Sequence, residues 1–361
     1  MLYPIITLLA SSPFHIGIIS YACVLLLSLF NIFLDGIRVA YLIPIILVNV
    51  YLISSGHDID FVVINVLLHC FCLLTFVNKN RLMLLRDTLC LIIIANVFLF
   101  LYSKLFNYDV FFVSSIAKGI EDGIPLYRGI YSTPQLLASM CLIYWVVLYS
   151  TIKNANKFHL SVVLPLSIFL CLMSFNRTIL GGSILIFGMG YIFNRSPRFF
   201  FLFLLLCIVA IPLIFELITT VNIETVNSRL YLSGFVWDTI DKYDVCKLLF
   251  GDQSVFSTEV KVVNYFVLNN IENGFLFLFR FFGLCGLFFY TLCIVLFMYK
   301  SYVKNRDFVY VCFILFYFVF VQLITQEFVS INFYISVLAV LSITKVSGAK
   351  NEKNSVFSSG R

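Results

Sequence analysis

The chain has 361 residues, of which 61% are hydrophobic and only 12% are charged. So apolar a composition leaves no room for a soluble domain of ordinary size, and it indicates an integral membrane protein. The net charge of +6 comes from basic residues that flank the apolar segments, so it does not indicate a nucleic-acid partner.

Apolar segments of membrane-spanning length recur along the chain. A helix needs about 20 apolar residues to cross a bilayer, and the sequence predicts about eleven such helices, within a range of roughly ten to twelve. We expect them at residues 16–34, 38–54, 60–78, 88–106, 133–152, 159–175, 178–194, 199–220, 274–299, 308–325 and 328–345. The predicted fold class is an all-α polytopic membrane protein, with residues 1–361 forming one integral membrane domain and no cleavable signal peptide.

The loops between the predicted helices alternate in charge. Basic residues are concentrated in one set of loops: Arg38, Lys79, Arg81, Arg86, Lys153, Lys157, Arg195, Arg198, Lys300, Lys304, Arg306, Lys345, Lys350 and Lys353. By the positive-inside rule this set is cytoplasmic, which places the N-terminus outside and residues 346–361 in a cytoplasmic tail. The last residues of the tail, 358–361, read as an appended remnant and are given no functional role.

Two external segments interrupt the run of helices, at residues 107–132 and 221–273. Loops as long as the second are uncommon unless they are functional. Within it a helix can begin near Arg229, because apolar residues then recur at helical spacing: Leu232, Phe235, Val236, Ile240 and Tyr243. We expect an amphipathic helix on the outer membrane face, and a helix that only shields the bundle is the alternative. Cys246 is the one cysteine in this loop, so no external disulfide is expected.

Four arginines lie within or next to apolar sequence on the predicted external side: Arg128, Arg177, Arg229 and Arg280. A charge in such a position costs about 2.5 kcal/mol or more, so it is retained chiefly for function. Arginines that converge on one side indicate an anionic ligand, because the guanidinium group matches phosphate oxygens better than an ammonium group does.

Arg280 has the most informative neighbours. It lies two turns into a predicted helix on the same face as Asn273, and Glu272 is close enough to share a wet pocket with both. An ion pair between Arg280 and Glu216 is the structural alternative.

Arg177 lies in a tight external turn. The glycines that follow it, at positions 181, 182, 188 and 190, allow close helix packing that would hold Arg177 at the rim of the bundle. An interfacial arginine that reaches toward lipid headgroups is the alternative. Arg128 is expected to be exposed, whereas Arg229 is followed by Tyr231 and Trp237, whose rings could stack on sugars.

A metal site has weaker support. Asp58 and Asp60 form a D-x-D pair on an external turn, a pattern that binds divalent metal with phosphate sugars, but charged residues at helix ends are common. Cys70 and Cys72 lie within a span without partner ligands and are expected to pack. No nucleotide-binding motif is present in the sequence, and neither a metal nor a cofactor is expected.

Several motifs resemble the bacterial O-antigen polymerase (Wzy) family and the related O-antigen ligases. The resemblance rests on the Ser-Phe-Asn-Arg-Thr turn at 174–178, on Arg229 and Trp237 followed by Leu-Phe-Gly at 249–251, and on Glu-Asn-Gly at 272–274 followed by Phe-Gly-Leu-Cys-Gly at 282–286. It covers residues 120–300 by motif and the first helices by topology. Related proteins often carry His-Asn at the position of Glu272-Asn273, and this departure favours a polymerase over a ligase.

The resemblance implies a GT-C-like, metal-independent, inverting glycosyltransferase of the bacterial inner membrane with its site on the periplasmic face. Its substrates would be undecaprenyl-diphosphate-linked oligosaccharides, polymerised into O-antigen or a related polysaccharide, with a chain-length regulator protein as a further partner. Arg177 and Arg280 would hold the diphosphate and Glu272 would accept the proton of the attacking hydroxyl. The remaining candidates would bind substrate: Arg128, Arg229, Asn273, Tyr231 and Trp237.

Other functions remain open. An O-antigen ligase and a D-x-D glycosyltransferase acting on a lipid monophosphate sugar are two of them. A flippase of the same lipid-linked unit would not need the long external loop and would be expected to show inverted repeats, which the sequence lacks. A purely structural subunit would not concentrate arginines on one side.

Overall fold

The computed structural model describes residues 82–113, 125–200, 236–254, 273–325 and 332–344, with shorter pieces at 63, 66, 70, 202–203, 233–234, 261–262, 266–267, 271 and 330. These residues are mostly helical, as the sequence predicts. Two of their helices, Leu82–Phe106 and Gly274–Asn305, are long and apolar enough to cross a membrane. The predicted helices at 16–34 and 38–54, and most of those at 60–78 and 199–220, lie outside the described residues.

The described helices follow the predicted apolar segments closely. The first half of the chain contains α5 at Leu82–Phe106, α6 at Pro134–Ser150, a π-helical turn at His159–Val163 that continues into α7 at Leu164–Met173, and α8 at Arg177–Arg195. The second half contains α11 at Val245–Phe250, α12 at Gly274–Asn305, α13 at Phe308–Leu315, a π-helical turn at Phe316–Phe320, α14 at Val321–Ile324 and a further helix at Asn332–Thr344.

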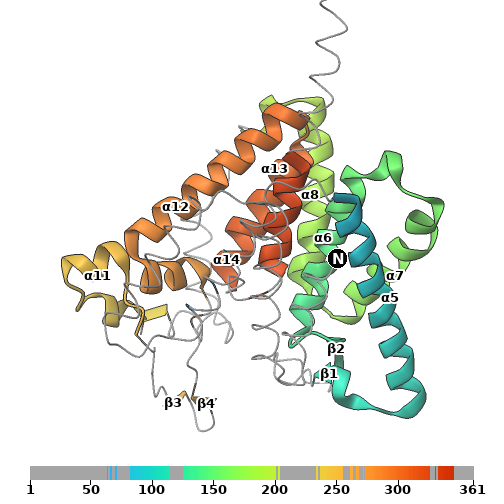
Figure 1. Ribbon diagram of the computed structural model, residues 1–361, viewed down its shortest axis with the longest axis horizontal. Coiled ribbons are helices and arrows are strands. Elements are labelled where there is room, and N and C mark those ends of the chain that lie inside the picture. Colours follow the sequence, from blue (N-terminus) through green and yellow to red (C-terminus); the bar gives the residue numbers. More distant parts are fainter. Residues whose placement is uncertain are drawn as a thin grey trace, which may run out of the picture.

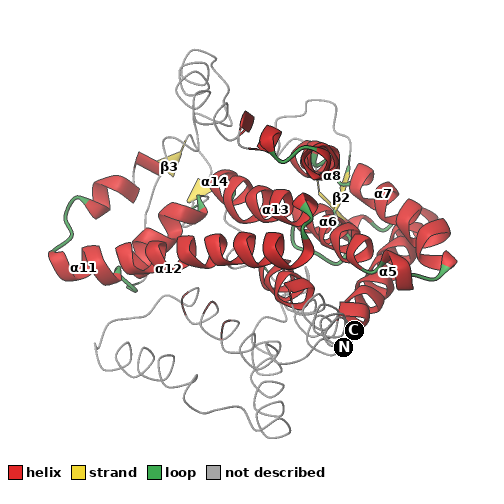
Figure 2. Ribbon diagram, turned by 90° about the horizontal axis from the view of Figure 1, so that it is seen from above, coloured by secondary structure: helices red, strands yellow, loops and turns green. Residues whose placement is uncertain are grey.

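The helices form a bundle whose core is built on α6 and α13. Almost every side chain of these two helices is buried, and α8 packs against both of them. Helices α5 and α7 cover α6 on one side, whereas α11 and the bend of α12 lie at the far side of the bundle (Figures 1 and 2).

Two short hairpins stand where the sequence analysis expected irregular loops. Strand β1, Phe112–Val113, pairs antiparallel with β2, Leu126–Tyr127, and β3, Lys261–Val262, pairs antiparallel with β4, Phe266–Val267. The Tyr127 hydroxyl donates to the Asn96 carbonyl at 2.5 Å, so the first hairpin is attached to α5.

Polar side chains cap the helices at their N-terminal ends, which explains where the helices begin. Asn176 caps α8 by accepting from the Ile179 amide at 3.1 Å, and Thr133 caps α6 just before Pro134. Such caps satisfy amides that have no partner within the helix and contribute about 1 kcal/mol each.

Two of the four glycines that follow Arg177 account for the close packing of α8 on α13. A Cβ atom on Gly182 would meet the Phe316 ring, and one on Gly190 would meet the Val309 backbone. The other two, Gly181 and Gly188, face open space. Close helix approach is therefore confirmed, but only along one face of α8.

The predicted placement of Arg86 in a loop is wrong. Helix α5 begins at Leu82 instead of residue 88, so Arg86 lies within it and is 5% exposed. Its guanidinium contacts the Asp87 carboxylate at 2.8 Å and donates to the Asn154 carbonyl at 3.1 Å. A local carboxylate and a carbonyl therefore make a buried arginine tolerable here.

The predicted continuous helix at 274–299 is also wrong, because α12 is broken at Gly283. This residue has φ 62° and ψ −164°, a conformation that favours glycine, and it divides α12 into a short buried arm at 274–282 and a long arm at 284–305. A Cβ atom on Gly283 would lie 2.4 Å from backbone atoms of Leu249, and one on Gly251, at φ 81°, would lie 2.3 Å from the Phe281 carbonyl carbon. The backbone at the break in α12 therefore packs directly against the backbone of the turn at 249–251.

Gly283→Ala should lower the stability of the fold markedly. A non-glycine residue in a disfavoured backbone conformation costs about 1–3 kcal/mol, and the new methyl group would also press on the Leu249 backbone. Thermal unfolding in detergent measures the loss. Gly188→Ala is the matched control, since its position is helical with open space around it, and it should stabilise by roughly 0.5–1 kcal/mol. Equal Tm values for the two variants would contradict the strained break.

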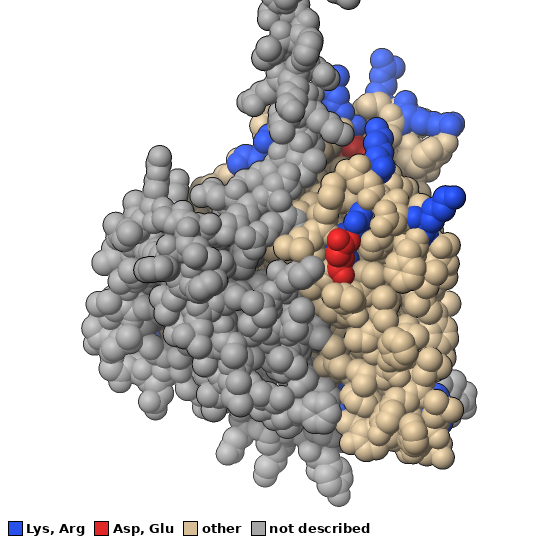
Figure 3. All heavy atoms as spheres, turned by 45° about the vertical axis from the view of Figure 1, so that its right-hand side comes forward, with Lys and Arg blue, Asp and Glu red and all other residues tan. Residues whose placement is uncertain are grey.

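Basic side chains gather at one end of the bundle, at the C-terminal ends of α6, α8 and α12. Asp307 joins these ends, because its carboxylate accepts from the Tyr149 hydroxyl at 2.9 Å and from the Asn194 amide at 2.8 Å. The basic residues of this end are Lys153, Lys157, Arg195, Arg198, Lys300, Lys304 and Arg306. Figure 3 shows lysine and arginine side chains concentrated in the upper part of the described surface.

Candidate functional site

Arg280 is a buried arginine on the short arm of α12. It is only 5% exposed, and its guanidinium donates to the Asp252 carbonyl and to the Ser254 hydroxyl, the latter at 3.4 Å. The guanidinium also lies 3.5 Å from the Asp252 carboxylate, with the Tyr243 ring centroid 5.6 Å away. The described partner of Arg280 is thus Asp252, 28 residues earlier in the chain, and the alternative partner Glu216 lies outside the described residues.

Asp252 links two cations. Besides Arg280 it contacts the Lys247 ammonium at 3.1 Å, and its carboxylate accepts from the Ser254 amide at 3.0 Å. Asp244, which caps α11 by accepting from the Lys247 amide at 2.8 Å, places a second carboxylate beside these two cations. Lys247 is exposed on α11, so the positive charge of the cluster reaches the surface.

The charge of Asp252 persists across the neutral range. Burial by itself would raise the pKa of this carboxyl, but hydrogen bonds from Ser254 and Lys247 and the charge of Arg280 outweigh burial and lower the pKa from 3.8 to about 2. A depressed folded-state pKa means that the ionised carboxylate stabilises the fold above pH 3.8 and that this contribution is lost as the pH falls toward 2.

The loop at 251–254 closes the break in α12. Two carbonyls that the break releases from the helix accept hydrogen bonds from this loop: the Asp252 amide donates to the Arg280 carbonyl at 2.8 Å, and the Gln253 side chain donates to the Phe281 carbonyl at 2.9 Å. The break, the loop and the buried arginine therefore form one unit, because each supplies the polar partners of the others.

Asn273 begins α12. Its side-chain oxygen accepts from the Phe275 and Leu276 amides at 2.9 and 3.1 Å, and its side-chain nitrogen donates to the Leu323 carbonyl at 3.2 Å. The Asn273 side chain therefore caps α12 and also contacts α14. Glu272, the predicted base, lies outside the described residues, between the buried Ile271 and this cap.

Arg177 is exposed in the first turn of α8, directly after the Asn176 cap. Among the described residues its side chain has no ion pair. It is therefore open to solvent, whereas close helix packing was predicted to hold it at the rim of the bundle. Arg128 is less exposed than expected, because its guanidinium donates to the Val110 carbonyl at 2.8 Å and to the Ser132 carbonyl at 3.3 Å. Arg128 therefore also braces the segment at 107–132.

The N-terminal ends of α6, α8 and α12 lie together at the end of the bundle opposite the basic one. Helices α8 and α13 run antiparallel, since Gly190 lies against Val309 and Gly182 lies against Phe316 just after α13. If this alignment continues toward the start of α8, Arg177 lies at the level of α14. The residue after α14, Thr325, accepts from the Gln135 side chain in the first turn of α6 at 3.0 Å. Because Asn273 also bonds to α14, the structure brings Arg128, Arg177 and the start of α12 to one end.

The segment at 221–273 contributes an aromatic side chain, Trp237, beside the short arm of α12. The predicted amphipathic helix is helical at 233–234 and 236–240, and it ends earlier than expected, at Ile240. Residues 241–242 then form a turn, and Asp244 caps the start of α11. The apolar face of the predicted amphipathic helix packs into the bundle through the buried Val236 and Ile240. Trp237 is 49% exposed, with its ring 5.9 Å from that of Phe279.

Several predicted residues have no described position. Arg229, Tyr231, Asp58, Asp60 and Cys72 lie outside the described residues. Within the described ranges no group of three metal-ligating side chains comes together. Asp252 and Lys247 are residues that sequence reasoning missed, and their only sequence signal is proximity to Gly251 in the Leu-Phe-Gly motif.

No protein-family model, no curated protein and no solved structure matches this chain. The fold and the site by themselves define a mostly helical protein with two described helices of membrane-spanning length and a buried arginine paired with Asp252 at a helix break.

Proposed function

We propose that the protein is a polytopic, GT-C-like glycosyltransferase of the bacterial inner membrane that polymerises undecaprenyl-diphosphate-linked oligosaccharides on the periplasmic face. The observation that carries this proposal is the buried Arg280, paired with Asp252 at the break of α12 and flanked by Lys247 of α11. Arginine suits phosphate oxygens, because its planar guanidinium group can bind two of them at once.

The arrangement of helix ends supports one shared site. Arg128, Arg177 and Asn273 lie at the end of the bundle opposite the basic side chains, which by the positive-inside rule is the periplasmic end. The N-terminal ends of helices also carry partial positive charge, which favours an anion there. A lipid diphosphate, anchored in the bilayer and displayed at its outer surface, fits this position.

In the proposed reaction, a sugar hydroxyl of one lipid-linked unit attacks the anomeric carbon of another. The new glycosidic bond forms as the bond from carbon to the diphosphate oxygen breaks, with inversion at that carbon. Glu272 accepts the proton of the attacking hydroxyl, and Arg177 and Arg280 stabilise the charge that develops on the departing diphosphate. Arg128, Arg229, Asn273, Tyr231 and Trp237 hold the saccharide and the diphosphate in register.

Polymer formation should survive EDTA, because in this mechanism arginines neutralise the diphosphate. Membranes that contain the protein and its lipid-linked repeat unit should give the same polymer ladder with and without chelator. Asp58→Ala and Asp60→Ala should likewise retain the ladder. Loss of the ladder on chelation, restored by magnesium or manganese, would favour the D-x-D enzyme instead.

Cys246 should react from the periplasmic side. It is exposed on α11, next to the charged cluster, and a thiol there is accessible to reagents in the outer aqueous phase. An impermeant maleimide should label it in intact spheroplasts, with Cys246→Ser as the control that loses the label. Labelling that appears only after lysis would place the site in the cytoplasm and contradict the proposed orientation.

A further inference from the structure

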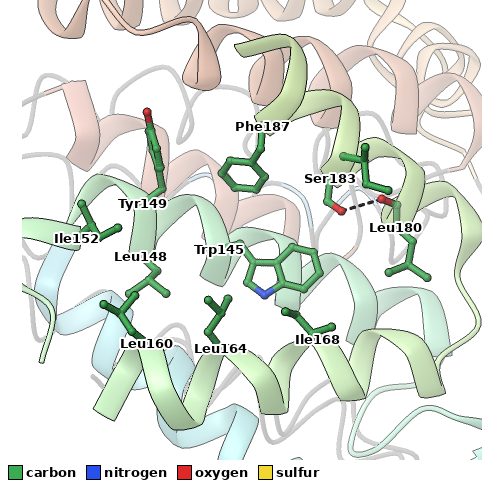
Figure 4. A pocket seen from close by; sticks show the side chains of 11 residues that line it. Trp145, Leu148, Tyr149, Ile152, Leu160, Leu164, Ile168, Leu180, Ser183 and Phe187 are labelled. Carbon is green, nitrogen blue, oxygen red and sulfur yellow. Dashed lines mark hydrogen bonds between the residues drawn. The ribbon is translucent and has the colours of Figure 1, made fainter. Parts of the chain in front are cut away.

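A slot of about 500 Å³ opens between α7 and α8 (Figure 4). These helices follow one another through a tight turn and each packs against α6, yet they make few contacts with each other. The slot therefore has α7 and α8 as walls and α6 as its floor, where Trp145 lies.

The slot offers no free polar side chain to an occupant. Its lining includes three residues with a polar side-chain atom, and each atom has an internal partner. The Trp145 indole N–H donates to the Ser167 hydroxyl at 2.7 Å, and the Ser183 hydroxyl donates to the Leu180 carbonyl at 2.7 Å. The third, the Tyr149 hydroxyl, donates to Asp307. Apolar cavities stay dry and bind apolar groups, so a sugar or a column of water does not suit this slot.

The slot is continuous with an apolar outer surface. Ile184 on the α8 wall is 74% exposed, and Leu160 and Ile168 on the α7 side are 40% and 42% exposed. Helices as apolar as these would face lipid in a membrane, so a hydrocarbon chain can enter from the side without crossing water.

The basic end of the bundle supplies a place for a headgroup. Ile152 and Leu160 line the slot at this end, and the exposed Lys153 and Lys157 lie on the same connection between α6 and α7. Lysines beside an anionic membrane surface attract its phosphates.

We propose that this slot binds one fatty acyl chain of an anionic phospholipid, with the phosphate at Lys153 and Lys157. The apolar lining accommodates the chain, and the two lysines select the charge of the headgroup. This inference depends on the membrane position of the bundle and not on the proposed transferase activity, since it concerns the opposite end of the helices.

Tryptophan fluorescence can test the proposal directly, because the chain contains only two tryptophans, Trp145 and Trp237. In the Trp237→Phe background, emission comes from Trp145 alone. The protein is reconstituted in nanodiscs of phosphatidylcholine with increasing fractions of either phosphatidylglycerol or phosphatidylcholine carrying brominated acyl chains. We expect the anionic brominated lipid to quench Trp145 at a lower mole fraction than the neutral brominated lipid does. The mole fraction needed should fall by about fivefold for each lysine that contacts the headgroup.

Two matched pairs of variants identify the slot and its headgroup contact. Lys153→Gln with Lys157→Gln should abolish the preference for the anionic lipid, whereas Lys300→Gln with Lys304→Gln, at the same end of the bundle, should preserve it. Filling the slot with Ser183→Phe should reduce quenching, whereas Leu185→Phe, whose position on α8 is 54% exposed and does not line the slot, should not. Equal quenching by the two lipids in the Trp237→Phe protein would overturn the proposal, and so would strong quenching that persists in a folded Ser183→Phe variant.

Discussion

Replacing Arg280 with glutamine is expected to destabilise the fold and to abolish polymer formation. Arg280 is 5% exposed and lies 3.5 Å from the Asp252 carboxylate, and removing one partner of a buried pair costs about 3–5 kcal/mol. Arg280→Lys keeps the charge but lacks the planar fork that binds phosphate in two places. The lysine variant should therefore give normal protein yield and very little polymer. Thermal unfolding and polymer ladders are measured on the same preparations.

A double-mutant cycle separates the ion pair from other effects of the substitution. If Arg280 and Asp252 interact, the double variant Arg280→Gln with Asp252→Asn should lose less stability than the two single losses added together. Glu216→Gln should resemble the wild type. A loss of stability from Glu216→Gln equal to that from Arg280→Gln would make Glu216 the partner of Arg280. Wild-type ladders from both Arg177→Lys and Arg280→Lys would show that these two arginines do not hold the diphosphate.

Glu272→Gln is expected to abolish turnover while substrate still binds. Glutamine keeps the size and hydrogen bonding of glutamate but is a far poorer base, and general-base contributions are typically about 10²–10⁴-fold. The residue directly precedes the Asn273 cap, so a change in charge there should leave the helix start intact. Initial rates of ladder formation and binding of the lipid-linked unit are measured separately.

Glu259→Gln provides the control for this substitution, because Glu259 belongs to the same long external loop. It should form polymer at the wild-type rate. A fully active Glu272→Gln variant would remove the general-base role, and equal losses in both variants would indicate that acidic residues of the loop act only through folding.

The sequence predicts the described helices well because their signals are local. Apolar runs of spanning length locate α6 and α8 to within a few residues. The close approach of α8 to its neighbour also follows from glycine spacing, although only contacts in three dimensions reveal that Gly182 and Gly190 face α13 while Gly181 and Gly188 do not.

The break in α12 and the partner of Arg280 could not be predicted in this way. Apolar composition continues unchanged through Gly283, and its unusual conformation depends on the 249–251 turn, which is distant in sequence. Asp252 was one acidic residue among many in the external loop, and only the fold of that loop brings it to Arg280.

The most direct test of the proposed polymerase is the product formed by the purified protein alone. The protein is reconstituted in nanodiscs with its lipid-linked repeat unit and EDTA, and the products are separated by size and assayed for the retained lipid diphosphate. The proposed function predicts a ladder of lipid-linked oligomers that grows by whole repeat units, together with released undecaprenyl diphosphate. A substrate that stays at one repeat unit, or that only changes its side of the membrane, would contradict a glycosyltransferase and favour a flippase.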